Sequence, residues 1–126
     1  MIVKLYAPLS YWKGLKDGKV KKVCNGCGAK HGIKFSPLFF GLNMTMCCDI
    51  HDWMYHEGKS NNDKDIADRV FLNNMLRVIE AKPSNSFIES LRKSRAESYY
   101  LAVKLFGGNA FWDGKNLIEN YREVRI

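Results

Sequence analysis

Apolar residues recur at helical spacing through the middle of the chain and predict three helices. The first is expected at 42–56, the second at 63–81 and the third at 86–106. Gly58 suits the end of the first helix, and Pro83 ends the second because proline interrupts helical hydrogen bonding. The pattern therefore predicts a mainly α fold.

Polar residues at the helix starts support this interpretation. Asn61 or Asn62 can cap the second helix, because a side-chain oxygen there accepts an otherwise unpaired backbone N–H. Ser86 and Glu89 have the spacing of a capping box for the third helix.

The segments outside the three helices carry weaker patterns. Residues 1–23 are lysine-rich and are predicted to be irregular, with a short hairpin at Asp17-Gly18 as one option. Residues 24–36 hold three glycines and two cysteines, which is typical of a loop that closely approaches a ligand. Residues 107–126 are expected to form a C-terminal tail that could include a short docking helix.

Composition and charge limit the function classes. At 126 residues and 46% hydrophobic, the chain is predicted to be a single globular domain. It has no apolar run approaching the roughly 20 residues of a bilayer-spanning helix. Residues 1–6 lack the apolar core of a secretory signal, which predicts a cytoplasmic protein or release by a non-signal route. The net charge of +7 favours an anionic partner, either nucleic acid or a membrane surface.

The first predicted helix carries the residues most suited to chemistry. On a helix, Met44, Cys48, His51 and Tyr55 form one stripe. Asp52 lies about 100° around the helix from His51, so both side chains can face one cleft. This arrangement suits a general base beside a metal ligand.

The second predicted helix offers a partner for His51. Asp68 borders the apolar face of this helix, where a carboxylate is costly unless it is paired. An antiparallel neighbour bearing His51 and Tyr55 would supply a ring N–H and a phenol. Asp68 would then fix the tautomer of His51 and leave its other nitrogen able to accept a proton from water. The alternative is that Asp68 is simply exposed.

The loop before the helices could complete a metal site. Calcium prefers hard oxygen ligands, including backbone carbonyls from a flexible loop such as 25–28. A disulfide from Cys27 to Cys47 or Cys48 would hold this loop against the first helix. A general base, a cation and free loop N–H groups together indicate ester hydrolysis by an activated water.

The segment Cys48-Asp49-Ile50-His51-Asp52-Trp53-Met54-Tyr55 resembles the active-site helix of the phospholipase A2 superfamily, whose signature is Cys-x-x-His-Asp-x-x-Tyr. The loop 25–28 is similar to the calcium loop of that family, and Asp68 matches the aspartate of a later Asp-x-x-Phe motif. The resemblance covers roughly residues 24–76. The short spacing between the two helices and the few cysteines resemble small prokaryotic or viral members.

The resemblance implies a phospholipase A2-like fold, with two antiparallel active-site helices, a third helix and an N-terminal metal-binding loop. It implies that His51 is the general base, that Asp68 orients it, and that Tyr55 hydrogen-bonds to Asp68. Asp52 would bind Ca²⁺ through its carboxylate, with further oxygens from the loop residues Gly26, Gly28 and Asn25.

The implied reaction is hydrolysis of the sn-2 ester of a glycerophospholipid at a membrane surface, with no nucleic acid partner. The candidate disulfide joins Cys27 to Cys48. Four apolar residues near the expected cleft could receive an acyl chain: Leu38, Phe39, Phe40 and Met44.

Two alternatives belong to other function classes. Cys24, Cys27, Cys48 and His51 could form a Cys₃His zinc site, which would indicate a module that binds nucleic acid or protein. This alternative gives no role to Asp52, Tyr55 or Asp68. The other alternative keeps the fold without the chemistry, as a catalytically inactive lipid-binding relative.

Overall fold

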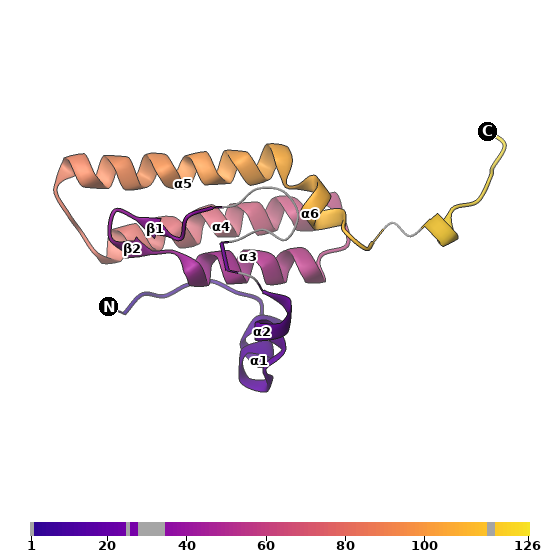
Figure 1. The fold of residues 1–126 in the computed structure, drawn as a ribbon, viewed down its shortest axis with the longest axis horizontal. Coiled ribbons are helices and arrows are strands. Elements are labelled where there is room, and N and C mark those ends of the chain that lie inside the picture. The colour runs from indigo at the N-terminus through magenta and orange to yellow at the C-terminus, as the bar shows by residue number, and fades with distance from the viewer. Residues whose placement is uncertain (1, 25, 28–34, 116–117) are drawn as a thin grey trace.

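The computed structural model is mainly helical and describes every residue except 1, 25, 28–34 and 116–117 (Figure 1). The described elements, in chain order, are α1 (Leu9–Asp17), α2 (Lys19–Val23), β1 (Leu38–Phe39), β2 (Leu42–Asn43), α3 (Thr45–Glu57), α4 (Asn61–Ala81), α5 (Ser86–Phe106), α6 (Gly108–Trp112) and a 3₁₀ turn, Ile118–Asn120. No helix in this described part of the chain is both long and apolar enough to cross a membrane.

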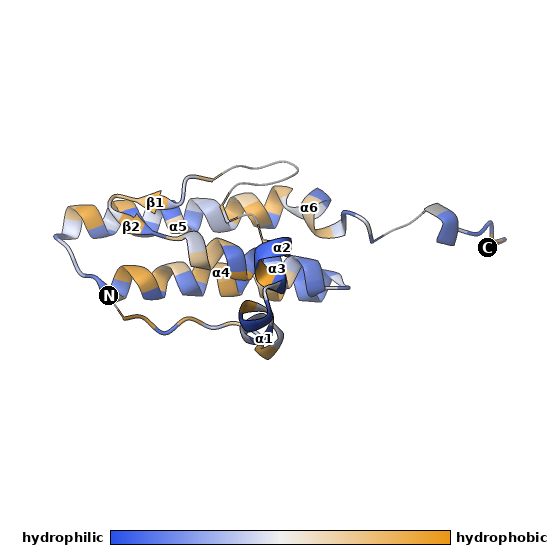
Figure 2. Cartoon of the chain, turned by 60° about the horizontal axis from the view of Figure 1, so that its bottom comes forward, coloured by the Kyte–Doolittle hydropathy of each residue, from blue (hydrophilic) through white to orange (hydrophobic). Residues whose placement is uncertain are grey.

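Helix α4 runs antiparallel to both α3 and α5, and short connections join the three helices (Figure 1). Hydrophobic and hydrophilic residues are interleaved along α4 and α5, as amphipathic helices require (Figure 2). Their apolar sides meet in the main core, together with residues of the β1–β2 hairpin. The largest fully buried residues of this core include Phe39, Met44, Phe71, Met75 and Ile79.

Two helix caps lie one or more residues before their predicted positions. Ser60, not Asn61 or Asn62, caps α4: its hydroxyl accepts the N–H of Asp63, and the Asp63 carboxylate accepts the N–H of Ser60. Asn85, not Ser86, caps α5. Ser60 and Asn85 have extended backbone, which a cap needs and which a residue inside the helix does not have.

The chain before α3 forms a small antiparallel hairpin, so the predicted start of this helix at residue 42 is wrong. Leu42 pairs with Phe39 across the hairpin. The two turn residues, Phe40 and Gly41, have φ of 49° and 91°, the left-handed conformation of a two-residue hairpin turn. Arg92 of α5 donates to the carbonyls of Phe39 and Phe40 over 3.2 and 2.6 Å, which holds the hairpin against α5.

The prediction of an irregular segment at 1–23 is wrong for residues 9–23, which contain α1 and α2, whereas residues 2–8 have no helix or strand. Gly18, with φ of 84°, turns the chain between these helices, so Asp17-Gly18 is a helix corner and not a hairpin. Gly14 packs directly on the Trp53 ring, where a Cβ would lie 2.9 Å from a ring carbon. The Trp53 indole donates to the Ser10 hydroxyl over 3.0 Å. These contacts dock α1 on α3.

The predicted C-terminal docking helix is present as α6, which is only five residues long. Its Phe111 is fully buried and packs edge-on against Tyr55 of α3, with ring centroids 5.2 Å apart. Beyond α6 the described tail extends away from the helices (Figure 1). The element α6 therefore closes one end of the helical layer beside Tyr55.

Candidate active site

Helix α3 points His51 and Tyr55 at α4, where both contact Asp68. The distance from His51 Nε2 to Asp68 Oδ1 is 2.8 Å, and the Tyr55 hydroxyl donates to the same oxygen over 2.7 Å. Asp68 is only 1% exposed, so the alternative of an exposed Asp68 is wrong. The predicted contacts among these three side chains are confirmed.

Lys64 completes the surroundings of Asp68 and was not among the predicted site residues. Its ammonium donates to Asp68 Oδ2 over 2.8 Å and is itself buried. Lys64 stands four residues before Asp68 on α4, a spacing at which helical side chains meet. That spacing is the signal in the sequence that could have identified it.

The electrostatics keep His51 neutral and Asp68 ionised at neutral pH. Burial lowers the pKa of His51, and this effect exceeds the opposing influence of its hydrogen bond to Asp68. Burial raises the pKa of the Asp68 carboxyl, but hydrogen bonds from His51, Lys64 and Tyr55 outweigh burial and the net shift is downward. Because Asp68 is then an acceptor, His51 carries its proton on Nε2, and Nδ1 can accept a proton.

Aromatic rings fix the plane of the His51 imidazole. The ring stacks on Phe71 of α4, with centroids 4.6 Å apart and planes 28° apart. The imidazole also contacts the ring of Tyr55, and the centroids of these two rings lie 4.1 Å apart. A ring held by stacking and by one hydrogen bond has little freedom to rotate, as a general base requires.

His51 and Asp52 both line a cavity of about 60 Å³. This volume exceeds the 10–15 Å³ or so that one water needs, so the cavity that His51 lines has room for water. The prediction that His51 and Asp52 face one cleft is confirmed. The remaining wall comes from Gly26, Cys27, Phe35, Cys48, Tyr55, Phe71, Val103, Phe106, Gly107 and Ala110.

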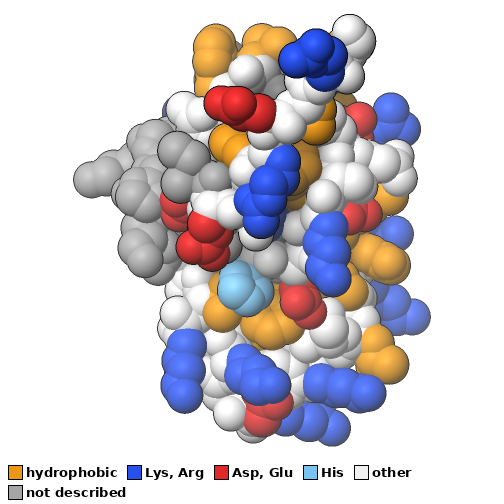
Figure 3. All heavy atoms as spheres, turned by 90° about the vertical axis from the view of Figure 1, so that its right-hand side faces the viewer, with side chains coloured by type: hydrophobic (Ala, Val, Ile, Leu, Met, Phe, Trp, Pro, Cys, Tyr) orange, Lys and Arg blue, Asp and Glu red, His pale blue; other side chains and the backbone are white. Residues whose placement is uncertain are grey.

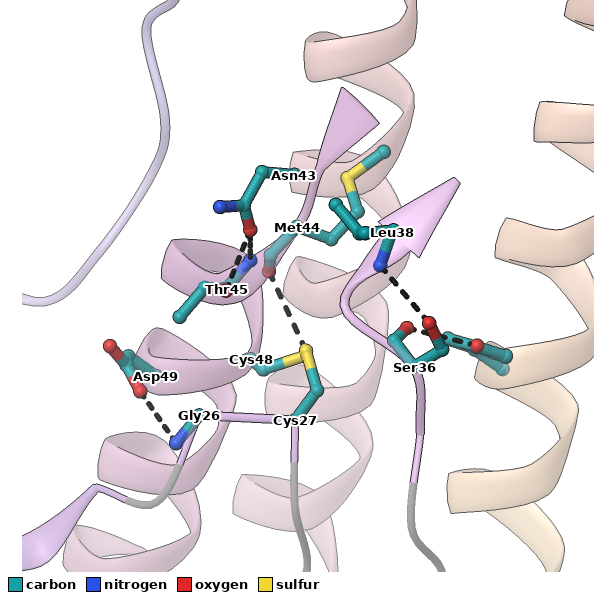
Figure 4. Close-up of a disulfide and its surroundings, with 10 residues drawn as sticks. Gly26, Cys27, Ser36, Leu38, Asn43, Met44, Thr45, Cys48 and Asp49 are labelled. Atoms are coloured by element: carbon teal, nitrogen blue, oxygen red, sulfur yellow. Dashed lines mark hydrogen bonds between the residues drawn. A yellow bond between two sulfur atoms is a disulfide. The ribbon is translucent and has the colours of Figure 1, made fainter. Parts of the chain in front are cut away.

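Two links hold the described part of the predicted metal loop against α3 (Figure 4). Cys27 and Cys48 form a disulfide, which is the candidate pair of the sequence. The N–H of Gly26 donates to the Asp49 carboxylate over 2.8 Å, and Gly26 has φ of 64°, a conformation that favours glycine. These links hold Gly26 at the wall of the cavity that Asp52 also lines.

The predicted calcium ligands are only partly within the described residues. Asp52 and Gly26 lie at the cavity and offer a carboxylate and a backbone carbonyl, which are the hard oxygen donors that Ca²⁺ prefers. Asn25 and Gly28 lie outside the described residues. The described part of the chain has no group of three or more His, Cys, Asp or Glu side chains that could hold a metal ion. A cation here would therefore depend on backbone carbonyls and water in addition to Asp52.

The four residues proposed to receive an acyl chain do not line this cavity. Phe39, on the β1–β2 hairpin, and Met44, which follows it, are fully buried in the main core. Leu38 and Phe40 are exposed on the hairpin. The apolar wall of the cavity comes instead from side chains that the motif did not indicate: Phe35, Phe71, Val103 and Phe106.

The zinc alternative does not fit this arrangement. Cys27 and Cys48 are joined in a disulfide, so two of the four proposed zinc ligands are not available as thiolates. His51 already directs Nε2 at Asp68.

Comparison with known proteins adds no family, since the chain matches no family model, no curated protein and no solved structure. The geometry of the site is therefore the basis for any functional proposal.

Proposed function

We propose that this protein is a calcium-dependent hydrolase of the phospholipase A2 type, with a phospholipase A2-like fold, which cleaves the sn-2 ester of glycerophospholipids. The observation that carries the proposal is the buried pair His51–Asp68, which shares a cavity wall with the carboxylate of Asp52. A neutral imidazole, fixed by a buried carboxylate and facing a space large enough for water, is the arrangement of a general base.

In the proposed reaction, His51 Nδ1 takes a proton from a water in the cavity as the water oxygen attacks the ester carbonyl carbon. Asp68 stabilises the positive charge that forms on the imidazole, while Tyr55 holds Asp68 in place. The tetrahedral intermediate collapses with cleavage of the bond to the glycerol oxygen. His51 then returns its proton to that oxygen, so that a fatty acid and a lysophospholipid leave.

Calcium would be held by the Asp52 carboxylate and by backbone oxygen from the loop at Gly26. When bound, the cation would polarise the ester carbonyl and balance the charge of the phosphate and of the oxygen that becomes negative. The two links that hold the loop to α3 support this part of the proposal, because they keep Gly26 at the cavity that Asp52 also lines.

Two further features support a phospholipid substrate at an anionic membrane surface. Phe106 lines the cavity and is 70% exposed, so the cavity has an apolar mouth. The chain carries a net charge of +7. Lysine and arginine side chains gather at the lower end of the face in Figure 3, the end at which Figure 1 places α1 and α2. Such a surface attracts anionic lipid headgroups.

The experiment that tests the proposal is fatty-acid release from vesicles of phosphatidylcholine and phosphatidylglycerol, with Ca²⁺ or with a chelator. We expect release only with Ca²⁺, from the sn-2 position. Asp52→Asn should lose both the activity and the Ca²⁺ binding measured by calorimetry. Release that continues in chelator, or unchanged Ca²⁺ binding by Asp52→Asn, would contradict the proposal.

A further inference from the structure

We propose that Lys64 is a positioning residue for this hydrolysis, holding the Asp68 carboxylate in the orientation that His51 requires and joining it to the end of α5 at the cavity wall. This inference rests on the proposed function, since it assigns a residue to the same site. The residue has no counterpart in the motifs that indicated the site.

The contacts of the Lys64 ammonium are specific. Besides Asp68 Oδ2, it donates to the carbonyl of Val103 over 2.9 Å and lies 3.5 Å from the carbonyl of Lys104. An ammonium has three N–H donors, and the described residues provide three oxygen atoms around it. Lys64 is only 8% exposed, and a charge buried to this degree is retained only with such partners.

The two oxygens of Asp68 have different partners, and this division fixes the carboxylate. Oδ1 receives hydrogen bonds from His51 and Tyr55, whereas Oδ2 receives the one from Lys64. Rotation of the carboxylate that moved Oδ1 away from His51 would break the ion pair at Oδ2. Lys64 therefore resists the motion that would release the imidazole from its reactive orientation.

The same ammonium ties the site to the cavity wall. Val103 and Lys104 belong to the last turn of α5, where the helix dipole makes a cation favourable. The Val103 carbonyl also accepts the N–H of Gly107 over 2.9 Å, so Lys64 is its second donor. Val103, together with Phe106 and Gly107 just beyond it, lines the cavity. Lys64 therefore links Asp68, and through it His51, to the part of the cavity wall at the end of α5.

The test is the activity of Lys64→Met, with Arg69→Met as the matched control. Arg69 is exposed on the same helix, so its variant loses the same charge without touching the site. We expect Lys64→Met to lower kcat on the order of 10- to 100-fold, with KM nearly unchanged, because a misplaced base slows chemistry more than binding. Arg69→Met should keep the wild-type kcat.

A double variant separates positioning from a general loss of stability. If Lys64 acts through Asp68, Lys64→Met should cost no further kcat in an Asp68→Asn background. Independent, additive losses, or a folded Lys64→Met with wild-type kcat, would overturn the proposal. If Lys64→Met does not fold, Lys64→Gln keeps one donor for Asp68. A several-fold loss of kcat in folded Lys64→Gln would then support the proposal, and a wild-type kcat would overturn it.

A spectroscopic measurement tests the positioning without any catalytic assay. The proton on His51 Nε2 lies in a hydrogen bond to Asp68, and its proton NMR resonance reports on that bond. We expect Lys64→Met to move or abolish this resonance and Arg69→Met to leave it in place. An unmoved resonance in Lys64→Met would overturn the positioning role, whereas absence of hydrolysis by the wild type would instead overturn the proposed function.

Discussion

Asp68 is the residue on which the interior of the site depends, since His51, Tyr55 and Lys64 all direct polar atoms at it. Asp68→Asn would keep the shape of the side chain but leave the buried Lys64 ammonium without its counter-charge. Breaking a buried ion pair in this way costs about 3–5 kcal/mol.

We therefore expect Asp68→Asn to lower the free energy of unfolding by about 3 kcal/mol, measured by urea titration. Asp65→Asn, at an exposed position on the same helix, is the control and should change it by less than about 0.5 kcal/mol. If Asp68→Asn and Asp65→Asn had equal free energies of unfolding, Lys64 and Asp68 would not be a coupled buried pair.

The expected pH dependence of the proposed hydrolysis follows from the burial of His51. Its pKa is lowered from 6.5 because burial disfavours the imidazolium, and only the unprotonated ring can act as a base. Activity is therefore present above this lowered pKa and is lost as the pH falls through it. The acid limb of a plot of kcat/KM against pH should therefore lie below pH 6.5, provided that binding of the protein to the vesicles is the same at each pH. An inflection above pH 6.5 would contradict this assignment.

Part of the site could be predicted because the relevant residues lie close together in the sequence. His51, Asp52 and Tyr55 occupy one helix, and helix geometry alone relates their directions. Lys64 was missed although it stands four residues before Asp68, a spacing that indicates contact on a helix. Its other two partners, the carbonyls of Val103 and Lys104, could not be predicted because they lie 39 and 40 residues away. The acyl-chain prediction failed because it assigned Phe39 and Met44 to a cleft, whereas tertiary packing places them in the core.

At the scale of elements, the junction of α5 and α6 determines how closely α5 approaches Tyr55. A Cβ on Gly107 would lie 2.6 Å from the Tyr55 hydroxyl and 2.5 Å from the Val103 carbonyl, whereas a Cβ on the adjacent Gly108 would meet nothing within 4 Å. We expect Gly107→Ala to lower the free energy of unfolding by about 1–3 kcal/mol and to reduce kcat. Gly108→Ala should be neutral or slightly stabilising. Similar effects of the two variants would contradict the packing described.

The disulfide between Cys27 and Cys48 is the covalent link between the loop and α3. A disulfide that closes a loop as long as the segment from Cys27 to Cys48 contributes about 3 kcal/mol to the free energy of unfolding, because it constrains the unfolded chain. Cys27→Ser should therefore lower the stability by about this amount and weaken Ca²⁺ binding in calorimetry. Cys24→Ser is the control, because serine can still donate to the Asp49 carbonyl that Cys24 contacts. Unchanged Ca²⁺ binding by Cys27→Ser would separate the loop tether from the metal site.

The elements differ in how far the sequence specifies them. Helices α4 and α5 each have 21 residues, and helices of that length carry several turns of apolar periodicity. Helices α1 and α2 have nine and five residues, with no side-chain cap at their starts. Their formation depends on contacts with α3, such as Gly14 on Trp53, which no local pattern encodes.

At the scale of the whole molecule, the packed helices bury His51 and Asp68, and the described part of the disulfide-tethered loop and α6 contribute to the wall of the cavity beside them. The net charge of +7 favours encounter with an anionic surface, and the exposed Phe106 marks the apolar mouth. The proposed reaction at the buried His51 would then require a single lipid to reach the cavity from that surface.

The central claim is that His51 activates water for ester hydrolysis. The most direct test is sn-2 fatty-acid release from anionic vesicles in Ca²⁺ by the wild type and His51→Ala, with circular dichroism of both proteins. We predict that His51→Ala abolishes release while its helical content equals that of the wild type. Full activity of a folded His51→Ala protein would contradict the account, as would the absence of release by the wild type.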